Sequence, residues 1–244
     1  TVALPVISAA GIEVSVIPTA VLSTHTGGFT GYTYRDLSDD LIAIANHWQS
    51  LNIKIDAVYT GFLGSLKQID IISEIFDKFK NINNYIIVDP VMADNGKLYE
   101  IYDMNFVQGM KKLCTKADII IPNMTEAAFL LDTEYKEGPY KQDYIEKLLK
   151  GLEKFGAKYI VLTGVYFDNN QLGAAVYDCD NKNIEYAFAQ KIDGFYHGTG
   201  DVFASVFIAA FLKGKTLKSA AQIAADFTVQ SILRTKEAAT DTRY

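Results

Sequence analysis

The hydrophobic positions along the chain repeat in two ways that alternate almost from end to end. Short continuous runs rich in Val and Ile are typical of strands buried on both faces of a sheet. Longer segments with apolar residues three and four positions apart predict amphipathic helices. The predicted strands span residues 13–18, 56–60, 85–88, 118–121 and 158–162. The predicted helices span residues 37–51, 65–79, 142–155, 199–212 and 217–235, with Ser38 as N-cap of the first.

Strands that alternate with helices of this length predict βαβ units, and therefore a largely parallel sheet with helices on both faces. Residues 172–177 and 184–189 differ from this pattern, because a short polar turn separates them. They predict an antiparallel hairpin near a sheet edge. The sequence contains no internal repeat, low-complexity segment or flexible linker. We therefore expect an α/β fold in a single domain covering residues 1–244.

The bulk composition narrows the classes of function. The 244 residues are 49% hydrophobic and 21% charged, with a net charge of -6. This balance argues against nucleic acid as the main partner, because phosphate backbones attract clustered Lys and Arg. No apolar run reaches the ~18 to 20 residues that a membrane span needs. The two cysteines, Cys114 and Cys179, lack the spacing of a disulfide framework or a zinc site, which favours a cytoplasmic location.

Both ends of the sequence are abrupt. The chain opens directly on apolar residues, without a methionine or the basic flank of a signal peptide. We therefore expect that a first strand of the domain precedes Thr1 and that the domain continues beyond Tyr244.

Polar and glycine-rich segments follow four of the predicted strands, at residues 60–65, 89–96, 122–126 and 163–164. In doubly wound sheets, ligands bind beyond the carboxyl ends of the strands. An ordinary turn explains any single one of these segments. It explains poorly why carboxylates and amides recur at successive strand ends, so the set as a whole favours a binding site.

The segment Gly198-Thr199-Gly200-Asp201 opens a predicted helix with an apolar continuation. Two glycines allow a tight backbone turn, so that free N–H groups and the positive end of the helix dipole can face a phosphate. Asp201 in the first turn is placed to take a proton from an attacking alcohol. The alternative is a plain helix start, with Thr199 as its cap and Asp201 complementing the dipole. Taken alone, the segment leaves the two interpretations evenly matched.

Phosphoryl transfer needs a metal ion and carboxylates to hold it. Asp89 and Glu126, each just beyond a predicted strand, are candidates, since Mg²⁺ usually takes one or two carboxylates and keeps several waters. An Asp-Pro turn and a first-turn helix charge are the structural alternatives. The sequence contains neither a GxxxxGK[ST] motif nor the HRD and DFG motifs, which excludes P-loop enzymes and protein kinases.

In this order along the chain, Asp89-Pro90-Val91-Met92, residues 122–126 and residues 198–201 resemble the ribokinase-like superfamily. Residues 22–29 and 61–65 resemble its pyridoxal/pyridoxine (vitamin B6) kinase branch. The resemblance runs from about Pro5 to Arg243. It implies a three-layer α/β/α fold and ATP-dependent phosphorylation of the 5′-hydroxymethyl group of a B6 vitamer, giving pyridoxal 5′-phosphate or its pyridoxine or pyridoxamine counterpart.

The resemblance also implies roles for individual residues. Gly198, Thr199 and Gly200 correspond to the anion hole, and Asp201 corresponds to the base that deprotonates the hydroxymethyl group. Thr26 matches a residue that lines the pyridine pocket, and Phe62 stands where the family often has a tyrosine beside the substrate. The nucleotide phosphates would be contacted by Asp89, Asp94, Asn123, Glu126 and Thr163 together with Gly198 and Gly200.

Asp89 and Glu126 would organise the Mg²⁺ ion in the same comparison, and K⁺ is a candidate second cation. Relatives commonly form homodimers, so a homodimer is expected here. His25 is a candidate for a hydrogen bond to a substrate hydroxyl, but a structural role in its loop is favoured. The remaining assignments are structural: His197 as a solvent-facing loop residue, and Phe203, Phe207, Phe211 and Phe227 as core.

Three alternatives remain beside the B6-vitamer kinase. A hydroxymethylpyrimidine kinase is the nearest, because its substrate is also an aromatic ring with a hydroxymethyl group. A sugar kinase is disfavoured, because only residues 27–33 are available for the lid such enzymes carry. A non-catalytic vitamin- or nucleotide-binding protein could share the scaffold, because fold does not fix function. Asp201 argues against it, since a binder needs no base at that position.

Overall fold

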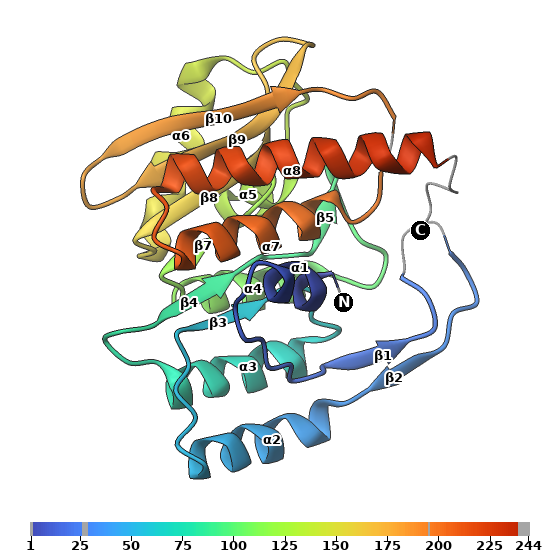
Figure 1. The fold of residues 1–244 in the computed structure, drawn as a ribbon, viewed down its shortest axis with the longest axis vertical. Helices are drawn as coiled ribbons and strands as arrows, with labels where there is room; N and C mark the ends of the chain where they lie inside the picture. The colour runs from blue at the N-terminus through green and yellow to red at the C-terminus, as the bar shows by residue number, and fades with distance from the viewer. Residues whose placement is uncertain (1, 26–28, 195, 239–244) are drawn as a thin grey trace.

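The computed structural model describes residues 2–25, 29–194 and 196–238, and a six-stranded sheet runs through its centre (Figure 1). The strand order is β10-β9-β8-β7-β4-β3. The parallel part consists of β3 (Ala57–Thr60), β4 (Tyr85–Val88), β7 (Ile119–Ile120) and β8 (Tyr159–Val165). The predicted hairpin is confirmed as β9 (Gln171–Asp178) and β10 (Asn183–Gln190). The two strands are antiparallel, and β10 is the outermost strand on its side of the sheet.

Helices cover both faces of the sheet, which confirms the three-layer α/β/α arrangement (Figure 1). On one face lie α1 (Ala3–Ala9), α7 (Thr199–Leu212) and α8 (Leu217–Glu237). On the other lie α2 (Ser38–Ser50), α3 (Leu66–Phe79), α4 (Met104–Cys114), α5 (Met124–Leu131) and α6 (Gln142–Leu152), the last followed by a 3₁₀ turn at Glu153–Phe155.

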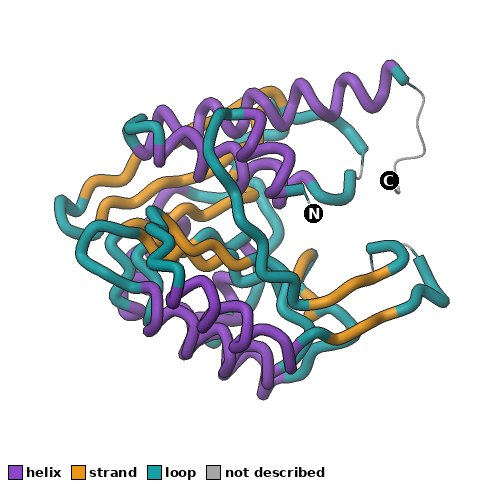
Figure 2. The backbone as a smooth tube through the Cα atoms, turned by 60° about the horizontal axis from the view of Figure 1, so that its bottom comes forward, coloured by secondary structure: helices purple, strands orange, loops and turns teal. Residues whose placement is uncertain are grey.

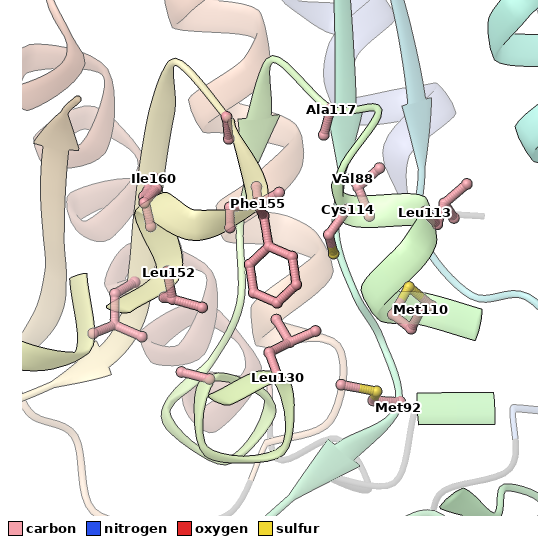
Figure 3. Packing of buried hydrophobic residues seen from close by; sticks show 14 of the residues in the cluster. Val88, Met92, Met110, Leu113, Cys114, Ala117, Leu130, Leu152, Phe155 and Ile160 are labelled. Carbon is pink, nitrogen blue, oxygen red and sulfur yellow. The ribbon is translucent and has the colours of Figure 1, made fainter. Parts of the chain in front are cut away.

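Alternating strand residues supply the two cores between these layers. In β4, Ile87 packs toward α7 and α8, whereas Ile86 and Val88 pack toward α3 and α4. Figure 3 shows part of the second core, where Phe155 meets side chains from α4 and α5. Because every central strand is buried on both faces, its sequence is apolar without interruption.

Two small hairpins lie outside the main sheet. The first pairs β1 (Ala20–Leu22) with β2 (Tyr34–Asp36), and we call these two strands the β1–β2 arm. The second pairs β5 (Ala93–Asp94) with β6 (Lys97–Leu98). The arm and the first turn of α7 lie at the same end of the molecule (Figures 1 and 2).

The strand predicted at residues 13–18 is wrong, because the structure assigns no strand there. Val14 packs against the core beneath α7 and α8, whereas Ile17 packs against the core on the opposite face. The apolar spacing of this segment therefore reflects contacts with two separate cores rather than one face of a sheet. The first strand is instead Ala20–Leu22.

Two smaller expectations are also corrected. Ser38 is the first residue of α2 rather than its N-cap, and the Asp36 Oδ1 accepts the Ser38 N–H at 2.6 Å. Phe227 is 45% exposed on α8, whereas Phe203, Phe207 and Phe211 do pack against the core as expected. Among the helices of the described part of the chain, none combines the length and the apolar character needed to cross a bilayer.

The contrast between Phe207 and Phe227 gives a test of the core. Phe207 is fully buried on α7, so Phe207→Ala should lower the free energy of unfolding by about 3–5 kcal/mol through lost burial and a residual cavity. Phe227→Ala should change it by less than about 1 kcal/mol, because much of that ring already contacts solvent. Urea denaturation of both variants measures the difference, and equal losses would contradict the assignment of the core.

Candidate active site

The carboxyl ends of the parallel strands converge through backbone hydrogen bonds that continue past the strands themselves. The Asp89 N–H donates to the Thr60 carbonyl at 2.9 Å, one residue beyond β4. The Thr163 N–H donates to the Pro122 carbonyl at 2.9 Å, and Thr163 forms a bridge with Asn123. Asp89, Asn123 and Thr163 are therefore brought to one edge of the sheet, as their positions in the sequence predict.

A capping box fixes the start of α5 at this edge. The Asn123 Oδ1 accepts the Glu126 N–H at 2.9 Å, and the Glu126 Oε2 accepts the Asn123 N–H at 2.8 Å. The other Glu126 oxygen, Oε1, accepts the Met92 N–H at 3.2 Å. The Asn123 Nδ2 donates to the Ala93 carbonyl at 2.8 Å. The two side chains thus join the helix start to the segment that leads into β5.

Asp94 lies at the turn between β5 and β6. Its Oδ1 accepts the Asn95 N–H at 2.9 Å, and its Oδ2 accepts the Asn95 side-chain amide at 3.1 Å. The Gly96 N–H in turn donates to the Thr125 Oγ1 at 3.0 Å. Asp94 therefore stabilises a turn that is tied to α5, and its charge is one of those that act on Glu126.

Two carboxylates are buried together at this edge of the sheet. Desolvation raises the pKa of the Asp89 carboxyl well above its usual range, and the charges of Glu126 and Asp201 add to this effect. Desolvation also raises the pKa of Glu126, although its backbone hydrogen bonds oppose the shift. The Tyr59 hydroxyl donates to the Asp89 Oδ2 at 3.4 Å. Like charges held this closely favour a cation between or beside them.

The start of α7 has the glycine turn that the sequence predicts, whereas the cap named in the alternative interpretation is wrong. Gly198, not Thr199, is the N-cap, and its φ of 77° is a left-handed conformation that a larger residue would adopt with strain. The Thr199 hydroxyl donates to the Tyr196 carbonyl at 3.2 Å instead of capping the helix. A Cβ at Gly198 or Gly200 would meet no atom within 4 Å, so the first turn borders open space. N–H groups at the start of a helix are suited to bind an anion.

Asp201 remains accessible to solvent, which a base that meets a substrate requires. The protein packed around it nevertheless raises the pKa of its carboxyl by desolvation, and the charge of His25 acts in the opposite direction. The His25 ring lies 5.3 Å from the His197 ring, centroid to centroid. His197 lies in the loop before α7, as expected, and is half-buried at this contact.

The remaining predicted residues are placed as follows. Phe62 is half-buried against the core, with its ring 6.3 Å from the Tyr102 ring. The Thr163 Oγ1 donates to the Pro122 carbonyl at 3.5 Å. Thr26 lies outside the described residues, so its predicted contact with the pyridine ring stays a prediction.

Sequence reasoning missed Tyr59 and favoured a structural role for His25. Tyr59 is half-buried, and desolvation together with the charges of Asp89, Asp201 and Glu126 raises the pKa of its hydroxyl well above its usual range. The sequence places Tyr59 only in the predicted strand at residues 56–60. Its partner Asp89 is 30 residues away, and no local pattern marks the pair.

The carboxylates fit a hydrated divalent ion better than a preformed metal centre. Among the described residues, no group of three or more His, Cys, Asp or Glu side chains is arranged to hold a metal ion. Mg²⁺ seldom requires such a group, because waters and nucleotide phosphates complete its shell. Both Glu126 oxygens already accept backbone N–H groups, which suits contact through water. Asp89 is the better candidate for direct coordination, because its Oδ2 has only the long bond from Tyr59.

The fold has three layers, with helices on both faces of the sheet. Together with the glycine-rich helix start beside Asp201 and the buried carboxylates at neighbouring strand ends, it defines a ribokinase-like small-molecule kinase. The family model described as phosphomethylpyrimidine kinase matches residues 4–242. The chain belongs to this family.

Curated relatives and a solved structure agree with the family. A pyridoxal kinase of Dictyostelium discoideum is 30% identical over 221 residues, which cover 84% of this chain and 71% of the relative. A hydroxymethylpyrimidine/phosphomethylpyrimidine kinase of Bacillus subtilis is 26% identical over 221 residues, covering 89% and 77%. A Bacteroides thetaiotaomicron protein provisionally named as a phosphomethylpyrimidine kinase was crystallised with pyridoxal. Its structure has a TM-score of 0.90 and 35% identity, and the match covers 96% of this chain and 82% of that one.

The buried carboxylates should make stability depend on pH in metal-free buffer. Since the folded state keeps their protons to a higher pH than the unfolded state does, stability should fall as pH rises. Between about pH 5 and pH 8, Asp89→Asn should remove part of this fall, up to about 1.4 kcal/mol per pH unit. Urea denaturation at several pH values, with chelator present, measures the slope.

Asp39→Asn is the matched control, because Asp39 is 92% exposed and should leave the slope unchanged. If wild type and Asp89→Asn have the same slope, Asp89 ionises normally in the folded protein.

Proposed function

We propose that this protein transfers the γ-phosphoryl group of ATP to the 5′-hydroxymethyl oxygen of pyridoxal, pyridoxine or pyridoxamine. The observation that carries the proposal is the start of α7, where Gly198 and Gly200 border open space directly beside Asp201. Asp201 is also close enough to Asp89 for their charges to interact. A base, an anion site and a candidate metal site therefore share one end of the sheet.

In this proposal Asp201 accepts the proton of the hydroxymethyl group. The freed oxygen lone pair forms a bond to the γ-phosphorus, the bond from that phosphorus to the β–γ bridging oxygen breaks, and ADP leaves. The proton stays on Asp201 until it passes to solvent, to which the side chain is open. General-base catalysis of this kind contributes roughly 10²–10⁴-fold to a rate.

The N–H groups of the first turn of α7, from Gly198 to Gly200, would bind the negative charge that develops on the transferred group. Their preorganisation matters, because donors that need not rearrange stabilise a transition state more than a ground state. Thr199 supports this geometry through its bond to the Tyr196 carbonyl. On the opposite side, Asn123, Thr163 and Asp94 are proposed to border the nucleotide phosphates.

Asp89, and Glu126 through water, would hold Mg²⁺. The ion would neutralise phosphate charge when bound, and it would also relieve the repulsion between the two buried carboxylates. K⁺ as a second cation, a homodimer and a cytoplasmic location remain predictions from the resemblance and the composition.

Pyridoxal is favoured over hydroxymethylpyrimidine as the acceptor. The 35% identical Bacteroides protein binds pyridoxal in its crystal, and the Dictyostelium relative is a pyridoxal kinase. Hydroxymethylpyrimidine is the second candidate, because the family model and the Bacillus relative are named for it.

Replacing the base tests the mechanism. Asp201→Asn keeps the shape of the side chain but cannot accept the proton, so kcat for pyridoxal phosphorylation should fall by about 10²–10⁴-fold. Nucleotide binding, measured by calorimetry, should stay largely unchanged. Asp193→Asn, an exposed carboxylate in the loop before α7, is the control and should keep wild-type kcat. Wild-type turnover in Asp201→Asn would rule out the assigned base.

A substrate panel tests the acceptor. With ATP and Mg²⁺, we expect kcat/KM for at least one B6 vitamer to exceed that for hydroxymethylpyrimidine by about tenfold or more. The expected reason is that the pocket must satisfy the polar substituents particular to the vitamin ring. Coupled measurement of ADP release gives both constants for each compound. A preference for hydroxymethylpyrimidine over every B6 vitamer would transfer the protein to the second candidate function.

A further inference from the structure

Gln68 is a fully buried polar residue in the first turn of α3, outside every role assigned so far. Its side-chain amide makes three hydrogen bonds to protein groups, and the Tyr34 hydroxyl is a further side-chain partner. The Oε1 accepts the Gly64 N–H at 2.7 Å, and the Nε2 donates to the Thr19 carbonyl at 2.8 Å and to the Asp36 Oδ2 at 3.3 Å. A buried amide that lost these partners would carry an uncompensated desolvation cost.

These partners belong to segments far apart in the sequence. Thr19 immediately precedes β1, and Asp36 ends β2, so the amide bonds to both strands at the base of the β1–β2 arm. The Leu37 N–H also donates to the Thr19 carbonyl, at 3.0 Å, which closes the base. Gly64 lies in the loop that follows β3. One side chain therefore joins the arm to that loop.

The loop itself is held from its other side. The Tyr102 hydroxyl donates to the Leu63 carbonyl at 2.6 Å, and this bond fixes the loop to the core above α4. Tyr34 of β2 lies directly on Gly64, where a Cβ would come within 2.0 Å of its hydroxyl oxygen. The arm thus packs against a residue without a side chain, and the hydrogen bonds of the Gln68 amide hold it there.

Both joined segments lead to the candidate active site. The loop carries Phe62, and the arm continues into His25, whose charge acts on Asp201. We infer that Gln68 is a positioning residue for the vitamer pocket, which sets the β1–β2 arm over the loop after β3 without touching either substrate. This inference rests on the proposed function for its kinetic consequence.

The contacts explain why an amide is needed. The Gly64 N–H donates to the amide oxygen. The Thr19 carbonyl and the Asp36 carboxylate accept from the amide nitrogen, in addition to the N–H groups of Leu37 and Ser38. Glutamate offers no donor and would place a second negative charge beside Asp36. Methionine has a similar length but can replace none of the three bonds.

The test uses a substitution and its compensation. Gln68→Glu should raise KM for pyridoxal at least tenfold and leave KM for ATP within twofold, because the arm borders the vitamer side. Gln68→Glu combined with Asp36→Asn should bring KM for pyridoxal back to within threefold of wild type. In that double variant the carboxylate at position 68 accepts the Gly64 N–H, and the amide introduced at position 36 can donate to it. The amide oxygen at position 36 can still accept the Ser38 N–H.

Gln49→Glu introduces the same charge change at an exposed position of α2 and should leave both KM values unchanged. Gln68→Met covers the case in which Gln68→Glu fails to fold, and it should show the same selective rise in KM for pyridoxal. Equal rises for ATP and pyridoxal, or no recovery in the double variant, would overturn the inference.

Hydrogen exchange separates this inference from the proposed function, because it needs no substrate. The amides of residues 20–22 and 34–36 should exchange faster in Gln68→Glu and return toward wild type in the double variant. If wild type phosphorylates no B6 vitamer, the proposed function fails, and the exchange data alone decide whether Gln68 anchors the arm. Unchanged exchange in Gln68→Glu and Gln68→Met would overturn the anchor.

Discussion

The buried Glu126 carboxylate, bonded to two backbone N–H groups, is the interaction on which the rest of the site depends. Through Oε2 it completes the cap of α5, and through Oε1 it holds the chain at Met92. The polypeptide between β4 and β5 therefore has one path over the end of the sheet. Asp89, at the start of that path, is forced into the same low-dielectric region. Glu126 thus fixes the chain beyond Asp89, and its charge adds to the desolvation that raises the pKa of the Asp89 carboxyl.

The two neighbouring carboxylates lower the stability of the folded protein and favour the binding of a cation. Two neighbouring carboxylates out of water destabilise the folded protein unless they are protonated or meet a cation. Neighbouring backbone donors reduce that cost for Glu126, while Asp89 has only the long bond from Tyr59. A divalent ion that binds with the nucleotide would remove the rest of this free-energy cost, because it would neutralise the repulsion between the two carboxylates. The geometry therefore favours a site whose carboxylates destabilise the protein in the absence of a cation and are neutralised when the cation binds.

The sequence predicted the central sheet well because burial on both faces leaves an uninterrupted apolar run, as in Tyr85–Val88. It predicted the helix from 199 because its start carries a clear signal, a glycine pair, and it also predicted the helix from 217. It did not predict α5, whose short sequence is apolar on nearly every side and therefore lacks helical periodicity. Residues 13–18 were wrongly predicted as a strand, because their apolar spacing comes from contacts with two cores and not from a place in a sheet.

A similar limit applies to the candidate site, because local sequence does not show which distant residues a side chain contacts. Asp89, Asn123, Glu126 and Asp201 could be found because each follows a strand or opens a helix, where local pattern and chemistry coincide. Tyr59 and Gln68 could not, because Asp89, Thr19 and Asp36 lie 30 to 49 residues away from them along the chain. The near partner of Gln68 is a backbone N–H, at Gly64, which no sequence pattern marks.

Asp201 lies where two differently built halves of the molecule meet. On one side are strand ends fixed by a continuous backbone ladder, and on the other is an arm held by a few side-chain bonds. Desolvation raises the pKa of the Asp201 carboxyl, and the charge of His25, in the segment that follows β1, acts in the opposite direction. The segment after the arm therefore lies close enough to the base for the two groups to interact. Because Tyr34 of the arm lies on Gly64 of the loop that carries Phe62, one placement of the arm sets both that loop and the segment that approaches the base.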